Sequence, residues 1–321
     1  MATIDIAIPN YNYGPFLEAC IGSVLAQGVD DIRILVIDNA STDDSVAVVR
    51  RLMASDGRIA LLARDRNLGL HASLNAFLDW AEGEFCLMLC ADDILAPDFL
   101  RRSLALMQDH PNAAFCYGIE VPFRSGEPLP SAPLQPAPAA VIMQGHRFIE
   151  DRFRQAERII SCGTVLCRTA LQKRIGAYRT ELRMTLDLEF LLRLAETGDV
   201  IFSNDRHAFR RQHDANYSAE LQASPTADLI ERGRALQWFL DHEGRTLPDR
   251  DALAHAMQRR LAARAYWWGV RDLVGGRLAR AAVSLRYAFA LVPAMAVLPP
   301  LDFLLREDGP VRRLSGGAPS R

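Results

Sequence analysis

The stretch that decides the fold is Phe85-Cys86-Leu87-Met88-Leu89-Cys90-Ala91-Asp92-Asp93, an apolar run that ends in two adjacent carboxylates. A short apolar run that stops at polar residues is typical of a strand buried on both faces, as in a parallel sheet. Ligands of such sheets bind beyond the carboxyl ends of the strands. The run therefore predicts a buried strand, and the two carboxylates mark the edge of the sheet where chemistry is expected.

The same pattern continues on both sides of this run. Apolar runs alternate with helical patterns through the first 121 residues, which is the order of elements in an α/β domain. The sequence therefore predicts a Rossmann-like, mostly parallel sheet flanked by helices. The strands are predicted at residues 4–8, 32–37, 58–63, 85–90 and 113–121, and the helices at residues 16–27, 42–54, 70–81 and 97–110.

Three further parts follow residue 121. Residues 122–143 are rich in proline, which predicts a long loop or lid instead of a helix or central strand. Residues 144–225 form a mixed segment, with a helix at 186–197 followed by short strands. Residues 226–321 are predicted to be a helical C-terminal extension, with helices at 228–242, 251–274 and 277–291, the last two separated by Gly275-Gly276.

The apolar segment at residues 287–298 is too short for a membrane-spanning helix, which needs about 20 apolar residues. A packed helical hairpin is the favoured interpretation of this segment. Contact with a membrane surface is the alternative that stays open.

Composition excludes several classes of function. With 37 basic and 39 acidic residues, the chain has no broad positive surface for nucleic acid. Lys173 is the single lysine and does not follow a glycine, so no phosphate-binding P-loop is present. The six cysteines form no Cys-x-x-Cys pair, and no secretion signal is recognisable at the amino terminus. We therefore expect a cytoplasmic protein with reduced thiols.

Polar residues follow the first two predicted strands. Pro9-Asn10-Tyr11 comes after the first strand, and an aromatic ring there can stack on a base; a simple turn is the alternative. Asp38-Asn39 comes after the second strand and can bind the edge of a base or a ribose hydroxyl. The neighbouring Asp43 and Asp44 are interpreted as complementing the helix dipole.

Asp92 and Asp93 repel each other at the end of a buried strand unless a positive charge lies beside them. A divalent cation such as Mg²⁺ or Mn²⁺ is the natural counter-charge, because these ions prefer oxygen ligands and bind substrate phosphates as well. A solvent-facing turn before Pro97 is the alternative.

The helix at 186–197 carries the next candidate. Asp187 shares a face with Leu191 and Leu194, whereas Glu189, Arg193 and Glu196 form a charged stripe. A carboxylate on the apolar face suits a general base, with stabilisation of the first helical turn as the alternative. Further along, the segment 210–216 groups arginines with His213, which suits phosphate or metal binding unless it is a solvated face.

The order of these motifs resembles that of the family 2 glycosyltransferases, which have the GT-A fold, over residues 3–220. The matching stretches are Ile8-Pro9-Asn10-Tyr11-Asn12, Val36-Ile37-Asp38-Asn39-Ala40-Ser41-Thr42-Asp43, Asn67-Leu68-Gly69, Ala91-Asp92-Asp93 with Pro97, Asp187-Leu188-Glu189-Phe190, and Arg211-Gln212-His213. The resemblance implies a nucleotide-sugar-binding half at residues 1–121 and an acceptor-side part at residues 144–225.

The resemblance also implies roles for single residues. Asp187 would be the catalytic base that deprotonates an acceptor hydroxyl, and Asp92 with His213 would hold Mg²⁺ or Mn²⁺. Tyr11 would stack on the donor's base and Asp38 would hydrogen-bond to it. The remaining residues implied in donor binding are Pro9, Asn67, Asp93 and Arg211.

The function implied is that of an inverting, metal-dependent transferase acting in bacterial cell-envelope polysaccharide biosynthesis. It would move a sugar from a UDP- or dTDP-linked donor to a hydroxyl of a glycan or lipid-linked acceptor, with peripheral membrane contact at the inner face of the cell membrane. Cys90 stands where many relatives have an acidic residue, so a non-catalytic nucleotide-sugar-binding relative is the alternative. Nucleotidyl transfer is disfavoured because residues 9–14 contain no Arg or Lys.

Overall fold

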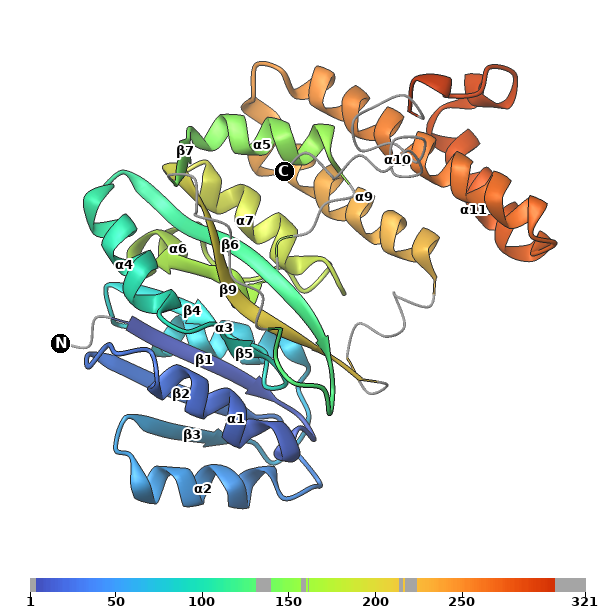
Figure 1. Cartoon of the computed structure of the whole chain (residues 1–321). Coiled ribbons are helices and arrows are strands. Elements are labelled where there is room, and N and C mark those ends of the chain that lie inside the picture. Colours follow the sequence, from blue (N-terminus) through green and yellow to red (C-terminus); the bar gives the residue numbers. More distant parts are fainter. Residues whose placement is uncertain are drawn as a thin grey trace. The chain divides into compact units, whose positions relative to one another are not determined.

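A computed structural model describes residues 4–130, 140–156, 160, 162–213, 216 and 224–303 of the chain (Figure 1). Residues 131–139 of the predicted proline-rich loop and the end of the predicted helical extension lie outside the described residues. The chain divides into two compact units, one formed by residues 1–149 and 159–216 and the other by residues 150–158 and 217–321.

The first unit contains one sheet, in which the described strands follow the order β3-β2-β1-β4-β8-β6-β9-β5, with β7 also paired to β9. Strands β1 to β4 are mutually parallel, whereas β8 runs antiparallel to both β4 and β6. The fold class predicted from the sequence, a mostly parallel sheet flanked by helices, is confirmed. The strands are β1 (Ile4–Asn10), β2 (Ile32–Asp38), β3 (Ile59–Ala63), β4 (Phe85–Met88), β5 (Ile94–Leu95), β6 (Ala113–Arg124), β7 (Val141–Met143), β8 (Val165–Arg168) and β9 (Asp199–Gln212).

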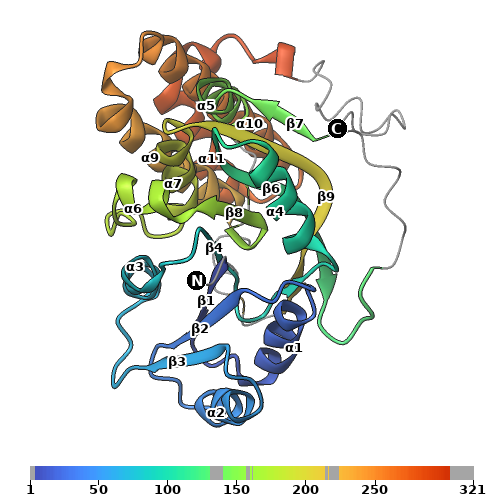
Figure 2. The same ribbon diagram turned by 90° about the vertical axis from the view of Figure 1, so that its left-hand side faces the viewer.

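Helices cover both faces of this sheet. Figure 2 shows α3 on one face and α1 and α4 on the other. Helix α1 buries Leu17, Ile21 and Val24, whose spacing of three and four residues places them on one side, against the fully buried strand β1. The helices of this unit are α1 (Gly14–Leu25), α2 (Ser45–Ser55), α3 (Leu70–Trp80), α4 (Phe99–Asp109), α6 (Thr169–Ile175) and α7 (Leu186–Ala195), and α5 (Gly145–Arg154) passes from this unit into the second.

Helix α2 begins three residues later than predicted, because Asp43 is used in a turn. Its carboxylate accepts hydrogen bonds from the backbone N–H groups of Gly14 and Ser45, at 2.9 and 3.0 Å. Asp43 therefore ties the start of α1 to the start of α2, which is a more specific role than the predicted complement to the helix dipole. Gly14 is required there, because a Cβ at this position would lie 2.3 Å from a carboxylate oxygen of Asp44.

The prediction of a loop over residues 122–143 was wrong at both of its ends. Strand β6 continues to Arg124, with Pro122 paired to Arg210 of β9, and β7 begins at Val141. Strand β8 pairs with residues 115–117 of β6, and no strand of the described residues pairs with β6 on that side beyond them. A proline is tolerated on an open side because its missing N–H removes no ladder hydrogen bond.

Helix α7 also differs from the expectation. Glu189 and Arg193 form the predicted i, i+4 pair, but both are buried, so they are not part of an exposed charged stripe. Leu191 and Leu194 are buried as well. The helix is therefore surrounded by protein on more sides than its pattern of charges suggested.

Strand β1 is anchored at its start by the fully buried Asp5. Its carboxylate accepts hydrogen bonds from Nε and Nη2 of Arg33 at 2.8 and 2.7 Å, and from the backbone N–H groups of Glu82 and Gly83 at 2.6 and 2.7 Å. Burial raises the pKa of Asp5, but these donors outweigh it and hold the pKa below its ordinary value.

We expect Asp5→Asn to lower the free energy of unfolding by about 2 kcal/mol at neutral pH, because charge-assisted hydrogen bonds are lost inside the protein. The pKa of Asp5 is lower in the folded chain than in the unfolded chain. The ionised carboxylate therefore contributes fully to the free energy of unfolding above about pH 4, and this contribution is lost as the pH falls through the folded pKa. Urea unfolding should therefore show a difference in the free energy of unfolding between the two proteins, and this difference should become smaller at acidic pH. Glu82→Gln, which alters an exposed partner of Arg33, is the control, and a difference that is equal at all pH values would contradict the assignment.

The second unit is helical in its described part. It contains α9 (Pro225–Asp241), α10 (Arg250–Val274) and α11 (Leu278–Leu291), together with the short helices at Glu243–Thr246, Pro293–Ala296 and Leu301–Phe303. Gly276 has a φ of +72° in the turn between α10 and α11, so the predicted break at Gly275-Gly276 is confirmed. Gly269 allows α10 and α11 to approach, because a Cβ there would lie 2.6 Å from Leu285. None of the helices in the described ranges has the length and apolarity that a membrane crossing requires.

Candidate functional site

The first part of the site is formed where β1 and β2 end side by side, with Asn10 paired to Asp38. Asn10 Nδ2 donates to Asp38 Oδ1 at 2.7 Å, and Ser41 donates to the same carboxylate from its backbone N–H at 3.0 Å and from its hydroxyl at 2.5 Å. Asp38 is almost completely buried, so its carboxylate is largely engaged within the protein. The carbonyl oxygen Oδ1 of Asn10 is buried and has no hydrogen-bond partner among the described residues.

The loops after β1 and β2 are joined to each other. Asn12 accepts a hydrogen bond from the backbone N–H of Thr42 at 2.7 Å, and its own N–H donates to Ser41 Oγ at 2.9 Å. Both loops contain a residue with positive φ, Asn12 at 59° and Ala40 at 64°, which costs backbone energy for a side chain such as that of alanine. Tyr11, the first residue after β1, exposes 45% of its surface and is available to stack on a ring.

Asn67 belongs to the same edge. Its Oδ1 accepts hydrogen bonds from Asn39 Nδ2 at 2.6 Å and from the backbone N–H of Gly69 at 2.8 Å. Asn39 Oδ1 in turn accepts from Leu68 N at 2.9 Å and Arg64 Nη1 at 3.2 Å. The structure therefore connects the predicted residue Asn67 to the end of β2.

Asp92 and Asp93, which follow β4, meet residues from the end of β9. Asp93 accepts a hydrogen bond from the backbone N–H of Arg211 at 2.9 Å, and Arg211 Nε donates to the backbone oxygen of Asp92 at 2.9 Å. Asp92 Oδ2 accepts from Asn216 Nδ2 at 2.8 Å and lies 3.1 Å from His213 Nε2. Residues about 120 positions apart in the sequence thus converge on one carboxylate pair.

This pair is electrostatically strained. Burial, followed by the neighbouring Asp92 carboxylate, raises the pKa of Asp93 well above its ordinary value. A divalent cation beside the two carboxylates would remove that penalty, because it favours the charged form of both.

Cys90 completes a cluster with the two aspartates. One ligand atom from each of Cys90, Asp92 and Asp93 lies within 4.8 Å of the others, close enough to surround one ion. A hydrogen bond with Cys162 and burial raise the pKa of the Cys90 thiol well above its ordinary value. The oxygen ligands of the cluster suit Mg²⁺ or Mn²⁺, so the residues present fit the predicted ion, with the carboxylates as its main ligands.

Aromatic rings that the sequence did not single out hold the β9 residues in place. The imidazole of His213 packs on Phe16 and Tyr13, with ring centroids 4.8 and 5.6 Å apart. The guanidinium of Arg211 lies 4.9 Å from the ring centre of Phe16 and 4.6 Å from that of Phe123. The spacing of Tyr13 and Phe16 on the first turn of α1 was the available signal, but their partners could not be known without the pairing of β9.

Asp187 lies at the start of α7, half-buried, with its Oδ1 accepting a hydrogen bond from Leu188 N at 2.9 Å. Burial raises the pKa of Tyr178 well above its ordinary value, and nearby charges on Cys162 and Asp187 add to this rise. Asp187 thus contributes to the electrostatic environment of Tyr178 from the start of α7.

The predicted site residues are thus located as follows. Asp92, Asp93, Arg211 and His213 contact one another, and Asp38 and Asn67 lie with Pro9 and Tyr11 along the ends of β1 and β2. Asn10 and Asn216 were not predicted as site residues, although both hydrogen-bond to a predicted one.

Comparisons with known proteins agree with this geometry. The sequence model of the family described as "Glycosyl transferase family 2" matches residues 5–174. An "Uncharacterized glycosyltransferase" of Haemophilus influenzae is 34% identical over 122 residues, which is 36% of this chain and 49% of that protein. A "PGL/p-HBAD biosynthesis glycosyltransferase" of Mycobacterium bovis is 28% identical over 210 residues, or 65% of this chain and 73% of that protein.

Two solved structures share the fold. Staphylococcus aureus TarS 1–349 in complex with UDP-GlcNAc has a TM-score of 0.59 and 17% identity, and the match covers 92% of this chain and 91% of that one. The mannosyltransferase PcManGT of Pyrobaculum calidifontis, in complex with GDP-Man and Mn²⁺, has a TM-score of 0.59 and 18% identity, covering 94% and 76% of the two chains. At this identity the likeness establishes the fold alone. The chain spans about half the length of the Haemophilus influenzae protein.

Proposed function

The chain belongs to glycosyl transferase family 2, and from this premise we propose that it transfers a sugar from a nucleoside-diphosphate sugar to an acceptor hydroxyl with inversion at the anomeric carbon. The observation that carries the proposal is the buried pair Asp92 and Asp93, linked to Arg211 and His213 at the carboxyl edge of the sheet. This arrangement suits a negatively charged diphosphate brought in with a cation.

We propose that the end of β1 binds the base of the donor. A uracil or thymine ring presents one N–H between two carbonyl groups, which side-chain carboxylate and amide groups at the ends of β1 and β2 can bind. The largely engaged Asp38 orients the Asn10 amide, and the exposed ring of Tyr11 stacks on the base. This supports a UDP- or dTDP-linked donor, with Pro9 and Asn67 lining the same subsite.

Asp92 and Asp93 would hold Mg²⁺ or Mn²⁺, with His213 next to Asp92. When bound, the ion neutralises charge on the diphosphate leaving group. Arg211 Nε holds the backbone of Asp92, while its charge adds to the positive field around the leaving group. The rings of Phe16 and Phe123 fix this guanidinium in position.

Asp187 acts as the general base in this proposal. It accepts the proton of the acceptor hydroxyl while the oxygen attacks the anomeric carbon and the bond to the diphosphate breaks on the opposite side. One displacement of this kind inverts the configuration. The residues of 1–121 bind the donor and those of 144–225 face the acceptor, a glycan or a lipid-linked hydroxyl of the bacterial cell envelope, with the protein at the cytoplasmic face of the membrane.

The test is incubation with a panel of nucleotide sugars, with and without Mn²⁺, while release of nucleoside diphosphate is measured. Mn²⁺-dependent release from a UDP or dTDP sugar is the expected result. Binding without release would favour the second candidate function, a non-catalytic nucleotide-sugar-binding relative, which is favoured by the single observation that Cys90 replaces a carboxylate in the cluster.

We expect Asp92→Ala to abolish the part of donor affinity that depends on Mn²⁺. The variant removes the carboxylate closest to His213 and leaves the subsite at Asn10 unchanged. Isothermal titration calorimetry of a nucleoside diphosphate, with and without Mn²⁺, measures the effect, and Asp109→Ala on the exposed face of α4 is the matched control. Unchanged Mn²⁺-dependent affinity would show that other groups hold the ion.

A further inference from the structure

Exposed apolar side chains gather at two places in the described part of the helical unit, one at Val297, Leu298 and Leu301 and the other at the turn between α10 and α11. The turn between α10 and α11 presents Leu273, Val274 and Leu278, with exposed fractions of 50%, 85% and 66%. Val283 on α11 is exposed as well. Single exposed apolar residues are ordinary on soluble proteins, but three large ones around one Gly-Gly turn form a tip that needs an explanation.

Arginines surround this tip. Arg271, Arg277 and Arg280 lie within a few residues of it, and Asp272 is the acidic residue among them. Asp272 is buried and already paired, to Arg277 at 2.8 Å and to Arg280 at 3.7 Å. The guanidinium of Arg271 forms no ion pair or hydrogen bond within the described part of the chain, so three arginines against one aspartate leave the tip positively charged.

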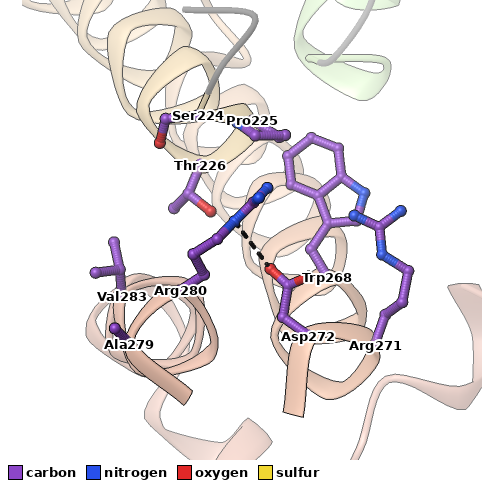
Figure 3. Close-up of a pocket in the computed structure, with 9 residues that line it drawn as sticks. All are labelled: Ser224, Pro225, Thr226, Trp268, Arg271, Asp272, Ala279, Arg280 and Val283. Carbon is purple, nitrogen blue, oxygen red and sulfur yellow. Dashed lines mark ion pairs between the residues drawn. The ribbon is translucent and has the colours of Figure 1, made fainter. Parts of the chain in front are cut away.

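A cavity of about 210 Å³ opens beside the tip (Figure 3). Trp268 and Arg271 line it from α10, Arg280 and Val283 from α11, and Ser224 to Thr226 close it from the start of α9. Ser224 forms no side-chain cap, and the first N–H groups of any helix lack intrahelical acceptors. The cavity thus combines two guanidinium groups, the Asp272 carboxylate that pairs with Arg280, a helix N-terminus and an aromatic ring. Of these groups, the Arg271 guanidinium beside the ring suits a phosphate ester at the edge of an apolar phase.

We propose that this end of the helical unit, the Gly275-Gly276 tip with its cavity, docks on a membrane that carries anionic phospholipids. Leu273, Val274 and Leu278 enter the level of the headgroups, and Arg271 and Arg280 bind phosphate groups there. Neither component is sufficient alone, because stable attachment to a membrane surface takes both apolar insertion and attraction to anionic lipid. The surface lies away from residues 287–298, where the sequence had left membrane contact open.

The proposal is tested by flotation of the full chain with vesicles. Vesicles of phosphatidylcholine alone are compared with vesicles that also contain phosphatidylglycerol. Binding to the anionic vesicles, falling as salt is added, is the expected result, because the Debye length shortens with ionic strength. Binding that is absent, or that is equal on both kinds of vesicle, overturns the proposal.

Two variants locate the surface. Val274→Glu should weaken vesicle binding at least tenfold, because it puts a carboxylate where an apolar side chain enters the membrane. Arg271→Ser should weaken it about fivefold, and only on anionic vesicles. The matched controls are Val297→Glu, at a residue that is 89% exposed in the same unit, and Arg50→Ser on the exposed side of α2; both should bind like the parent chain.

The assignment of the tip would be overturned if Val274→Glu bound vesicles as well as the parent chain does. It would also be overturned if Val274→Glu and Val297→Glu lost vesicle binding to the same extent. Self-association of the parent chain that Val274→Glu abolishes, without vesicle binding, would show that a second copy covers the tip instead. Release of nucleoside diphosphate measured without vesicles should be the same in Val274→Glu as in the parent, which separates failure of this proposal from failure of the proposed transferase activity.

Discussion

Asp187→Asn is expected to lower the turnover of glycosyl transfer by about 10²- to 10⁴-fold, equivalent to about 3 to 5 kcal/mol of activation free energy. The amide keeps the size of the side chain and can still accept the hydrogen bond from Leu188 N, but it cannot take a proton from the acceptor. The half-buried position at the start of α7 suits a group that meets a substrate hydroxyl.

The measurement is kcat with a nucleotide sugar and acceptor, together with donor affinity by calorimetry. Donor affinity should be unchanged, since Asp92, Asp93 and the end of β1 are untouched. Asp79→Asn, an exposed carboxylate on α3, is the control and should retain full turnover. Loss of donor affinity in parallel with turnover would assign Asp187 to donor binding and not to proton transfer.

Arg193→Met is expected to lower the free energy of unfolding by about 3 to 5 kcal/mol, because it leaves the fully buried Glu189 carboxylate without its closest cation. Arg193 Nε and Nη2 donate to the two carboxylate oxygens at 2.7 and 2.9 Å. Its other contacts hold the chain before α7, through the carbonyl oxygens of Ile175 at 2.6 Å and Ala177 at 3.0 Å. The variant therefore loses both the partner of the Glu189 carboxylate and the hydrogen bonds to the chain before α7.

Urea or thermal unfolding of the full chain measures this loss. The double variant Glu189→Leu with Arg193→Met should be milder than the single one, because no charge is left buried without a partner. Arg234→Met, which breaks an exposed pair with Glu231 in α9, is the control and should change stability by about 1 kcal/mol or less. A loss below about 1 kcal/mol in Arg193→Met would mean that Arg179, at 3.7 Å from Glu189, suffices as its partner.

The fold was predictable in segments whose secondary structure follows from the local sequence pattern. The alternation of apolar runs and helical patterns up to residue 110 located β1 to β4 and α1 to α4 within a few residues, because β1, β2 and β4 are apolar strands that are buried along most of their length. Strand β6 was cut short at Pro122 because proline was judged by its usual effect. Whether a proline removes a hydrogen bond depends on the strand beside it, which no local pattern reveals.

The charged stripe on α7 failed for a related reason. The spacing of Glu189 and Arg193 correctly predicts that they pair, but it does not reveal that the pair is buried, because charged side chains usually face solvent. Their burial depends on Arg179 and on carbonyl groups of residues 175–177, which are supplied by the chain before the helix.

The site residues also fall into two groups, those recognisable from their own chemistry and those placed only by the pairing of distant strands. Asp92, Asp93 and His213 were singled out because adjacent carboxylates and a histidine have recognisable chemistry, and the structure brings them together. Asn216 and Phe123 have no such signature. Their part in the site comes only from the pairing of β6 with β9, which joins segments about 90 residues apart.

The ladder between β6 and β9 also limits how this sequence can vary. Residues 120–124 face residues 208–212 one for one, and this pairing sets Arg211 against Phe123, with its side chain donating to the backbone oxygen of Asp92. An insertion or deletion of one residue between Ala208 and Arg211 would turn the following side chains to the opposite face, and put Arg210 or Gln212 in that position. We therefore expect this strand to tolerate an exchange of side chains far better than a change in its length.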